Sequence, residues 1–331
     1  MSASWLLPFL LAWAVDPAGV DPGVVGQGAV EPGTEGPVVV PFVLEHGLVF
    51  VDVELAGRGS VLALLDTGAN ASAIDPRRSD DLAVLERAAV VGTTGTLEAE
   101  MVRLEGARLG ALALPALRAS RRDLGGLLAP EGSAVEMILG SDALVGLAVT
   151  LDFVEQRLEL APSRKAADGA ADASVGGRGA SESTDALRGN VRNAVPMLLD
   201  DGIPAIEASL GGVTGWLRID TGASLFDTPE VYVNVPTRTW EALLRRHEGL
   251  APSTSFQGTG ADGAAVDLPV ARIPDVRIGP TRLDHAFVIV QPRAGYFAAP
   301  EAKGFVGNNF LRTLGRVTLD YGAGRLRVDV E

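Results

Sequence analysis

Two short stretches of the chain decide its fold, and they share one pattern. The first is Val61-Leu62-Ala63-Leu64-Leu65-Asp66-Thr67-Gly68-Ala69-Asn70, and the second is Trp216-Leu217-Arg218-Ile219-Asp220-Thr221-Gly222-Ala223-Ser224. In each, a short apolar run predicts a buried strand, and the strand leads into Asp-Thr-Gly-Ala. A carboxylate at the end of a buried strand is costly unless its desolvation is compensated. Asp66 and Asp220 are therefore the candidate functional residues.

The two stretches lie at equivalent points of an internal duplication. Val-Thr-Leu-Asp occurs at residues 149–152 and again at residues 317–320, each time followed by a second apolar segment at the same spacing. Upstream, Val40-Pro41 begins the stretch that leads to Asp66, and Val195-Pro196 begins the one that leads to Asp220. Landmarks repeated in the same order indicate two copies of one structural unit. A single Asp-Thr-Gly would be a weak motif, but two at matched positions are much more specific.

Composition favours short strands and turns. The 331 residues include 40 Gly and 20 Pro, more than the average share for a globular chain. We expect an all-β fold with few short helices, the helical candidates being residues 79–87 and 237–248 and short turns after Gly140 and Gly307. The expected organisation is a signal peptide (1–14), a flexible tether (15–36), a first lobe (37–161), a flexible linker (162–192) and a second lobe (193–331).

Charge and residue types exclude several functions. The chain carries 28 Lys and Arg against 42 Asp and Glu, a net charge of −14, which disfavours nucleic acid and anionic membranes as partners. It has no Cys, so disulfides, zinc–thiolate sites and cysteine nucleophiles are ruled out. Its three His show no metal-binding spacing, and we expect no metal site.

The N-terminus predicts export. Residues 5–15 are almost all apolar and contain Ala12-Trp13-Ala14, a pattern that a signal peptidase accepts. The run is far shorter than the roughly 20 residues that a membrane-spanning helix needs, and no later segment is long enough either. We expect cleavage near Ala14 and a periplasmic or secreted protein without a membrane span. An uncleaved short anchor and a wrongly assigned start are the alternatives.

The chain resembles the retropepsin-like aspartic proteases, including exported bacterial members. The resemblance rests on the two Asp-Thr-Gly-Ala loops, the closing Val-Thr-Leu-Asp strands, and two apolar-apolar-Gly elements, Ile138-Leu139-Gly140 and Phe305-Val306-Gly307. Single-lobe members of that family dimerise, so that each lobe contributes one aspartate. The resemblance implies two fused lobes related by a pseudo-twofold axis, an aspartic endopeptidase activity and a peptide or protein substrate. Gly140 and Gly307 would let the backbone pass close to the aspartate loops.

Two neighbouring carboxyl groups can hydrolyse a peptide bond without a metal or an organic cofactor. They share one proton because both cannot ionise cheaply. The ionised group takes a proton from a water, while the protonated one hydrogen-bonds the scissile carbonyl. The sequence does not decide which aspartate is the base, nor the pH optimum.

The resemblance also assigns supporting roles. Thr67 and Thr221 would hydrogen-bond across the lobe junction, and the amides of Gly68 and Gly222 would face the carboxylates. Ala69 and Ala223 complete the two motifs, whereas Asn70 and Ser224 differ and predict unequal support of the two aspartates. Two hairpins are expected to cover the substrate as flaps, and their candidate residues are Gly92, Thr94 and Gly95 in the first and Gln257, Gly258 and Gly260 in the second.

The linker length predicts that the lobes pair within one chain. A flexible segment of this length spans about 31 Å on average, comparable with a lobe diameter, so we expect a monomer. Two other functions stay open: a non-catalytic module that binds a peptide or a protein in the same cleft, and a surface β-protein in which the Asp-Thr-Gly loops are structural turns.

Overall fold

The computed structural model describes residues 14–15, 36–93, 95–163, 194–225, 228–259 and 265–329. The predicted export signal lies outside these residues except for Ala14, and the predicted tether except for Val15 and Gly36. The predicted linker lies outside them except for Pro162, the last residue of a strand, and Ser163. Over the described ranges, no helix is both long and apolar enough to span a membrane.

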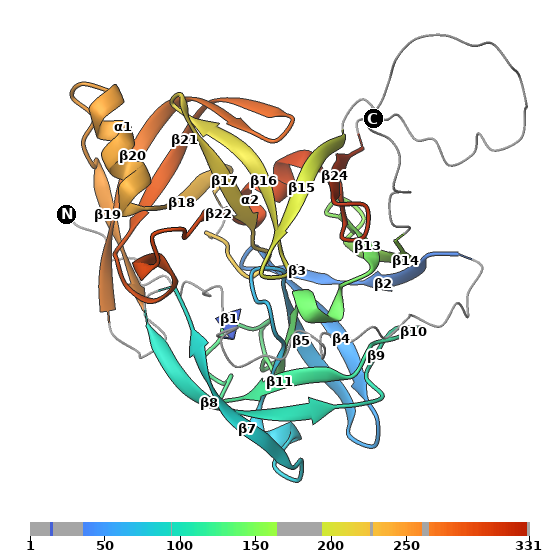
Figure 1. Cartoon of the computed structure of the whole chain (residues 1–331). Helices are drawn as coiled ribbons and strands as arrows, with labels where there is room; N and C mark the ends of the chain where they lie inside the picture. The colour runs from blue at the N-terminus through green and yellow to red at the C-terminus, as the bar shows by residue number, and fades with distance from the viewer. Residues whose placement is uncertain are drawn as a thin grey trace, which may run out of the picture.

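Strands dominate the structure, which confirms the predicted β-rich fold (Figure 1). Before residue 164 the elements are β1 (Ala14–Val15), β2 (Val38–Pro41), β3 (Val43–Glu45), β4 (Leu48–Leu55), β5 (Gly59–Asp66), β6 (Ala73–Ile74), η2 (Pro76–Arg78), β7 (Val84–Val91), β8 (Thr96–Leu104), β9 (Arg108–Leu109), β10 (Leu112–Ala113), β11 (Leu117–Arg121), β12 (Met137–Gly140), η3 (Ser141–Ala143), β13 (Leu147–Asp152) and β14 (Arg157–Pro162). We call this part, from residue 36 onward, the first half.

The second half, residues 194–329, repeats much of this order. Its elements are β15 (Ala194–Asp200), β16 (Ile203–Leu210), β17 (Val213–Ile219), β18 (Tyr232–Pro236), α1 (Thr237–Arg246), β19 (Thr254–Thr259), β20 (Ala265–Ile278), β21 (Thr281–Gln291), η6 (Gly295–Ala298), β22 (Gly304–Val306), α2 (Asn308–Leu311), η7 (Arg312–Leu314), β23 (Arg316–Asp320) and β24 (Arg325–Val328).

The strands that carry the two aspartates are paired in the same way. β5 runs antiparallel to β4 and parallel to β12, with Asp66 opposite Gly140. β17 runs antiparallel to β16 and parallel to β22, with Ile219 opposite Val306. Parallel neighbours bring their carboxyl ends to one edge of a sheet, so each Asp-Thr-Gly loop lies beside a strand that ends in the predicted glycine element.

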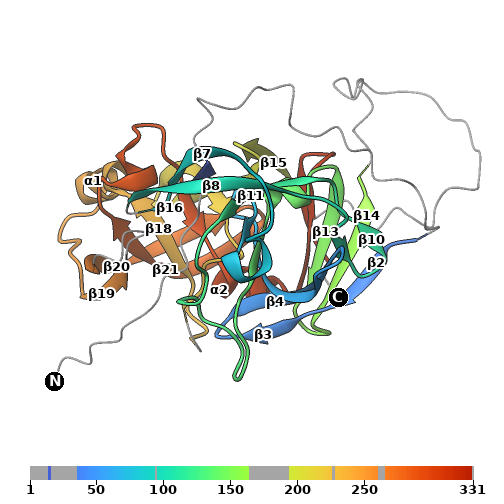
Figure 2. The same cartoon turned by 90° about the horizontal axis from the view of Figure 1, so that it is seen from below.

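One sheet crosses between the halves. β13 pairs with β14 in the first half and with β23 in the second, so that Thr150 lies opposite Thr318 (Figure 2). The two hydroxyls are 2.7 Å apart and hydrogen-bonded. At the end of this pairing, Arg316 forms ion pairs with Asp152 at 3.0 Å and Glu159 at 2.7 Å. The repeated Val-Thr-Leu-Asp segments therefore form the strands that join the halves.

Of the two longer predicted helices, one is present and one is wrong. Residues 237–246 form α1, which begins after Pro236 and ends with Arg245 and Arg246 in its last turn. Arginines there interact favourably with the helix dipole. Residues 79–87, in contrast, contain only the end of a turn and the beginning of β7, because residues 84–91 pair along β8. After Gly140 and Gly307 the chain forms the short helices η3 and α2, as expected.

The core is continuous across the molecule. One large apolar cluster includes the inward side chains of β4 and β5 in the first half, β16 and β17 in the second, and Leu151 and Leu319 on the joining strands. A second cluster contains Ala69 of the first aspartate loop and Leu225, which follows the second. The aspartate loops therefore rest on well-packed apolar residues on both sides.

Candidate active site

The two Asp-Thr-Gly loops bind each other through matched hydrogen bonds. The amide of Thr67 donates to the hydroxyl of Thr221 at 3.0 Å, and the amide of Thr221 donates to the hydroxyl of Thr67 at 3.1 Å. Each hydroxyl also donates to the opposite strand, Thr67 to the carbonyl of Ile219 and Thr221 to that of Leu65, both at 2.7 Å. Both threonines are fully buried, so these bonds fix the loops in one relative position.

Each aspartate side chain packs against the glycine of the opposite loop. A Cβ added at Gly68 would lie 2.6 and 2.7 Å from the carboxyl oxygens of Asp220, and one at Gly222 would lie 2.6 Å from both carboxyl oxygens of Asp66. Asp66 is 1% exposed and Asp220 0%. The structure thus brings Asp66 and Asp220 together, buried, at the junction of the two halves.

Asp66 is the better supported carboxylate. Its Oδ1 accepts hydrogen bonds from the amides of Gly68 at 2.9 Å and Ala69 at 3.1 Å. Burial raises the pKa of Asp66 to about 6, and the rise is limited by the Asp220 carboxyl, the Gly68 and Ala69 amides and the positive charge of Arg122. Burial and hydrogen bonding act in opposite directions on an acid, and burial dominates here.

Asp220 accepts fewer hydrogen bonds than Asp66. Burial raises its pKa well above the usual value, and repulsion from Asp66 raises it further. Neither of its side-chain oxygens has a hydrogen-bond partner of normal geometry among the described residues. Arg218 opposes the rise, but this guanidinium is already paired with Asp200 at 2.7 Å. Burial therefore raises the pKa of both carboxyls, and the two differ in the hydrogen bonds that they accept.

The two predicted glycines lie directly against the aspartate loops. A Cβ at Gly140 would be 3.0 Å from the carbonyl oxygen of Ala69, and one at Gly307 would come closer still to the carbonyl oxygen of Ala223. The next residue along the chain then donates its amide to that same carbonyl, Ser141 at 2.8 Å and Asn308 at 2.9 Å. Close approach of the two backbones is the reason that a side chain is not accommodated at either position.

The loops differ at the residues after the shared motif. Ser224 and the matched Asn70 are both half-buried, and the hydroxyl of Ser224 donates to Asn309 Oδ1 at 3.3 Å. Asn308 donates to the carbonyls of Thr221 at 2.7 Å and Gly47 at 2.8 Å, which ties a turn of the first half to the second loop. The unequal support expected from Asn70 and Ser224 stays a prediction.

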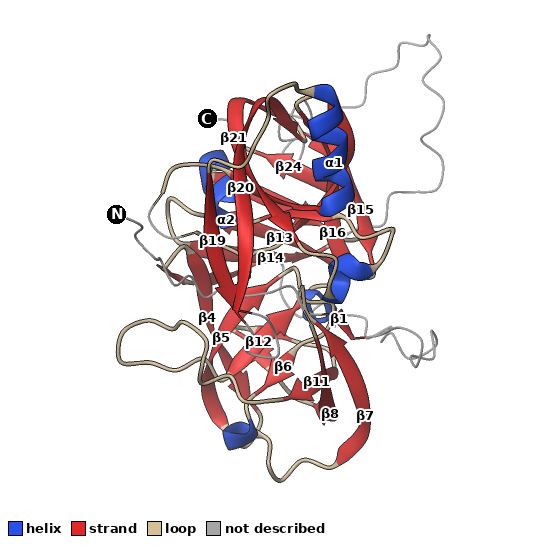
Figure 3. Cartoon of the chain, turned by 90° about the vertical axis from the view of Figure 1, so that its left-hand side faces the viewer, coloured by secondary structure: helices blue, strands red, loops and turns tan. Residues whose placement is uncertain are grey.

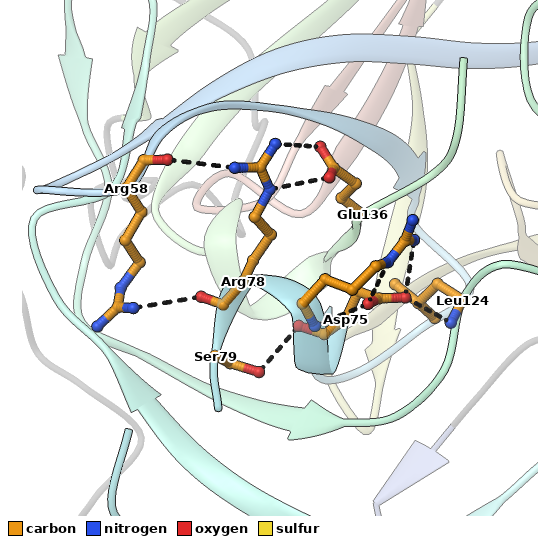
Figure 4. Close-up of polar contacts among 7 residues, drawn as sticks. Arg58, Asp75, Arg78, Ser79, Leu124 and Glu136 are labelled. Atoms are coloured by element: carbon orange, nitrogen blue, oxygen red, sulfur yellow. Dashed lines mark hydrogen bonds and ion pairs between the residues drawn. The ribbon is translucent and has the colours of Figure 1, made fainter. Parts of the chain in front are cut away.

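A polar network in the first half holds the loop that carries Arg122. Asp75 accepts hydrogen bonds from the amide of Leu124 at 3.0 Å and from Arg77, while Arg78 forms a two-pronged ion pair with Glu136 (Figure 4). Burial would raise the pKa of Asp75, but these hydrogen bonds outweigh it and lower the pKa. Burial also lowers the pKa of Arg122 to about 10, against the stabilising charge of Asp66.

Sequence comparison agrees with this geometry. Residues 51–143 match the family profile described as "Aspartyl protease". This match covers less than a third of the chain and includes Asp66 and Gly140. A retropepsin-like aspartic protease from Rickettsia conorii matches at 16% sequence identity and a TM-score of 0.30, over 41% of this chain and 89% of that one. No curated protein matches the sequence.

Both hairpins that the sequence predicts as flaps are present. β7 and β8 form the first, with Gly92 and Gly95 in its turn, and Thr94 lies outside the described residues. The amide of Gly92 donates to the carbonyl of Gly95 at 2.8 Å. β19 and β20 form the second hairpin, where Gln257 and Gly258 are paired with β20 and Gly260 lies outside the described residues.

The sequence does not indicate several charged and aromatic residues near Asp66 and Asp220. Arg218 lies on β17 two residues before Asp220, which directly follows the strand, so the alternation of an extended chain predicts that both side chains point to one face. Tyr296 stacks over the Arg218 guanidinium, 4.2 Å from the ring centre, and its amide donates to Gly92 at 2.8 Å. Nothing local marks Arg122 or Tyr296, because their contacts come from distant segments.

The described part of the chain contains no cluster of three or more His, Asp or Glu that could hold a metal ion.

Proposed function

We propose that this chain is an aspartic endopeptidase in which Asp66 and Asp220, one from each half, activate a water for attack on a peptide bond. The observation that carries the proposal is the packing of each buried carboxyl against the glycine of the opposite loop. This arrangement places two carboxyl groups of unequal proton affinity side by side, which is what general acid–base catalysis by such a pair requires.

The roles of the two carboxyls follow from their surroundings. Asp66, supported by two amides and Arg122, is the ionised base that takes a proton from the water. Asp220 is the protonated acid that donates a hydrogen bond to the scissile carbonyl. After attack, the proton taken by Asp66 passes to the leaving amine, so that the pair returns to its starting state with one shared proton.

The deciding experiment is digestion of a diverse peptide library by the full chain, with cleavage sites mapped by mass spectrometry between pH 3 and 8. Internal cleavage by the wild type is expected, and it defines the preferred residues on each side of the bond. If the library remains intact while peptides bind to the protein, the non-catalytic binding module becomes the better description.

We expect the activity to be greatest near neutral pH rather than in strong acid. Burial raises the pKa of Asp66 to about 6, so below that pH both carboxyls are protonated and the base is lost. The pKa of Asp220 is raised well above its usual value, so the acid is lost only at higher pH. A plot of kcat/KM against pH should rise between pH 5 and 7. An optimum at pH 3 would contradict these assignments.

We further propose that the halves are lobes related by a pseudo-twofold axis and that they pair within one chain. The reciprocal threonine bonds and the β13–β23 pairing support this, since both join residues of the same chain. The protein should therefore elute from gel filtration with the mass of a monomer at micromolar concentration. A dimer mass that persists on dilution would contradict intrachain pairing.

A further inference from the structure

The turn of the first hairpin is held by the second half. The carbonyl of Gly92 accepts a hydrogen bond from the amide of Tyr296 at 2.8 Å. Gly295 packs so closely on the turn that an added Cβ would lie 2.6 Å from the Gly95 nitrogen and 2.9 Å from the carbonyl carbon of Thr93. Thr93 is fully buried, although the tip of a hairpin is usually exposed. Figures 1 and 3 both show β7 and β8 reaching from the lower part of the molecule toward the half that carries β20 and β21.

The inner face of this hairpin shares its packing with the two aspartate loops. Val90 of β7 and Ala99 of β8 are buried in the apolar cluster that also contains Ala69 and Leu225, residues that follow the two aspartates. Buried side chains of one cluster are close-packed, so they cannot shift independently. The hairpin therefore belongs to the same packed unit as the aspartate loops.

The side chain of Tyr296 continues the contact toward Asp220. Its ring covers the guanidinium of Arg218, with Cζ 4.2 Å from the ring centre, a distance typical of a cation–π interaction. Arg218 is 3% exposed and lies on β17 two residues before Asp220, so an extended chain points both side chains to one face. Its positive charge lowers the pKa of Asp220, against burial and the repulsion from Asp66, which raise it. One residue thus contacts the hairpin turn through its backbone and Arg218 through its ring.

The charged groups around Arg218 leave it able to act on Asp220. Its Nε donates to Asp200 at 2.7 Å, and Lys303 pairs with the same carboxylate at 2.6 Å. The side chains of Arg218, Asp200 and Lys303 are 3%, 20% and 23% exposed, so two shielded positive charges face one negative charge. Asp201 lies 3.6 Å from Arg218 but its side chain is 53% exposed, so water and salt screen its charge. The shielded part of this group is therefore positive, which favours the ionised form of Asp220.

We propose that Tyr296 is a positioning residue, which links the turn of the first hairpin to Arg218 so that closure of the hairpin holds the guanidinium beside Asp220. The inference rests on the proposed function, since it concerns the proton that Asp220 holds for catalysis. While the turn is bound at Gly92, the ring shields the guanidinium from water and keeps its charge effective. When the turn leaves, water reaches Arg218 and screens its charge, and Asp220 then holds its proton more firmly. By linkage, the position of the hairpin and the proton affinity of Asp220 change together.

Two substitutions of Tyr296 in the full chain test the role of the ring. Tyr296→Phe keeps the ring over Arg218 and Tyr296→Leu removes it, whereas both lose the hydroxyl that accepts from the amide of Lys303 at 2.6 Å. The readout is the titration of the Asp220 carboxyl, followed by carbon-13 NMR and assigned by its absence from Asp220→Asn. We expect Tyr296→Leu to raise the proton affinity of Asp220 at least about threefold and Tyr296→Phe to leave it at the wild-type value. The alkaline limb of kcat/KM should move to higher pH in Tyr296→Leu, by about half a pH unit or more.

Replacement of Gly295 tests the link to the hairpin. Gly295→Ala places a Cβ against the turn, so Gly92 must move away from the Tyr296 amide. Gly249→Ala is the matched control, because Gly249 also has a positive φ, +80° against +50°, but has nothing within 4 Å of an added Cβ. In Gly295→Ala the Tyr296 amide should exchange with solvent at least about tenfold faster, and Asp220 should titrate as in Tyr296→Leu. Gly249→Ala should match the wild type in both measurements.

Both readouts are independent of catalysis, so the inference can fail separately from the proposed function. Identical titration of Asp220 in the wild type and in Tyr296→Leu, or an equal shift in Tyr296→Phe and Tyr296→Leu, would overturn it. So would equal exchange of the Tyr296 amide in Gly295→Ala and Gly249→Ala, or a wild-type titration of Asp220 in Gly295→Ala despite faster exchange. The expected shifts in a protein that cleaves no peptide would uphold the link and overturn only the peptidase assignment.

Discussion

Replacing Asp220 by Asn is expected to lower kcat/KM for peptide cleavage by about a thousandfold, and Asp66→Asn should do the same. Either change leaves one carboxyl where the proposed chemistry needs two. An asparagine at position 220 can still donate a hydrogen bond to a carbonyl but cannot exchange a proton, and an asparagine at position 66 cannot accept a proton from water. The measurement is kcat/KM on a peptide found in the library digest, at the pH of the wild-type optimum.

These variants should not lose stability, so that their lost activity is caused by the missing carboxyl and not by an unfolded protein. The pKa of Asp220 in the folded state lies above its usual value. In the pH window between these two values, the folded state binds more protons than the unfolded state. Stability therefore falls as pH rises through the window, and an uncharged Asn removes this dependence. Asp220→Asn should have a Tm at pH 7 equal to or above that of the wild type. A singly substituted protein that still cleaves at the wild-type rate would refute the dyad mechanism.

The aspartate loops could be found from the sequence because their signals are local. Each aspartate loop is marked by a short apolar run followed directly by Asp-Thr-Gly. Each glycine element is marked by two apolar residues followed by Gly140 or Gly307, and the duplication repeats both signals. The closing strands were found for the same reason, since Leu151 faces Leu158 just as Leu319 faces Leu326. The order of these local elements is enough to predict a β-rich chain with two similar halves.

The features that the sequence did not indicate depend on contacts between distant segments. Residues 84–87 were assigned to a helix, yet pairing with β8 makes them a strand, because a partner strand overrides weak helical preference. The positive charge of Arg122 lowers the pKa of Asp66 because the fold brings the loop of Arg122 near it. That loop is held by Asp75, which accepts from the Leu124 amide, and by Glu136, which pairs with Arg78. The inequality of the two carboxyls is therefore a property of the folded chain, although the motifs themselves are nearly identical.

A methyl group at Gly222 should damage the site severely, although less than loss of a carboxyl. A Cβ there would lie 2.6 Å from both side-chain oxygens of Asp66, well inside van der Waals contact, so Asp66 or the loop must move. Displacement of a catalytic group by about 1 Å costs about a hundredfold in rate. We expect Gly222→Ala, and equally Gly68→Ala, to lower kcat/KM by about that factor and to destabilise the fold by about 1–3 kcal/mol.

Gly215→Ala is the matched control, because Gly215 lies on β17, the strand that leads into the loop of Gly222, is exposed, and has nothing within 4 Å of an added Cβ. It should keep wild-type activity, and its stability should be unchanged or slightly higher, since alanine restricts the unfolded chain. Urea unfolding and kcat/KM measured on the same preparations separate the two effects at Gly222. If Gly222→Ala were as active as Gly215→Ala, the Asp66 carboxyl could not lie against the opposite loop, and the two aspartates would not form one site.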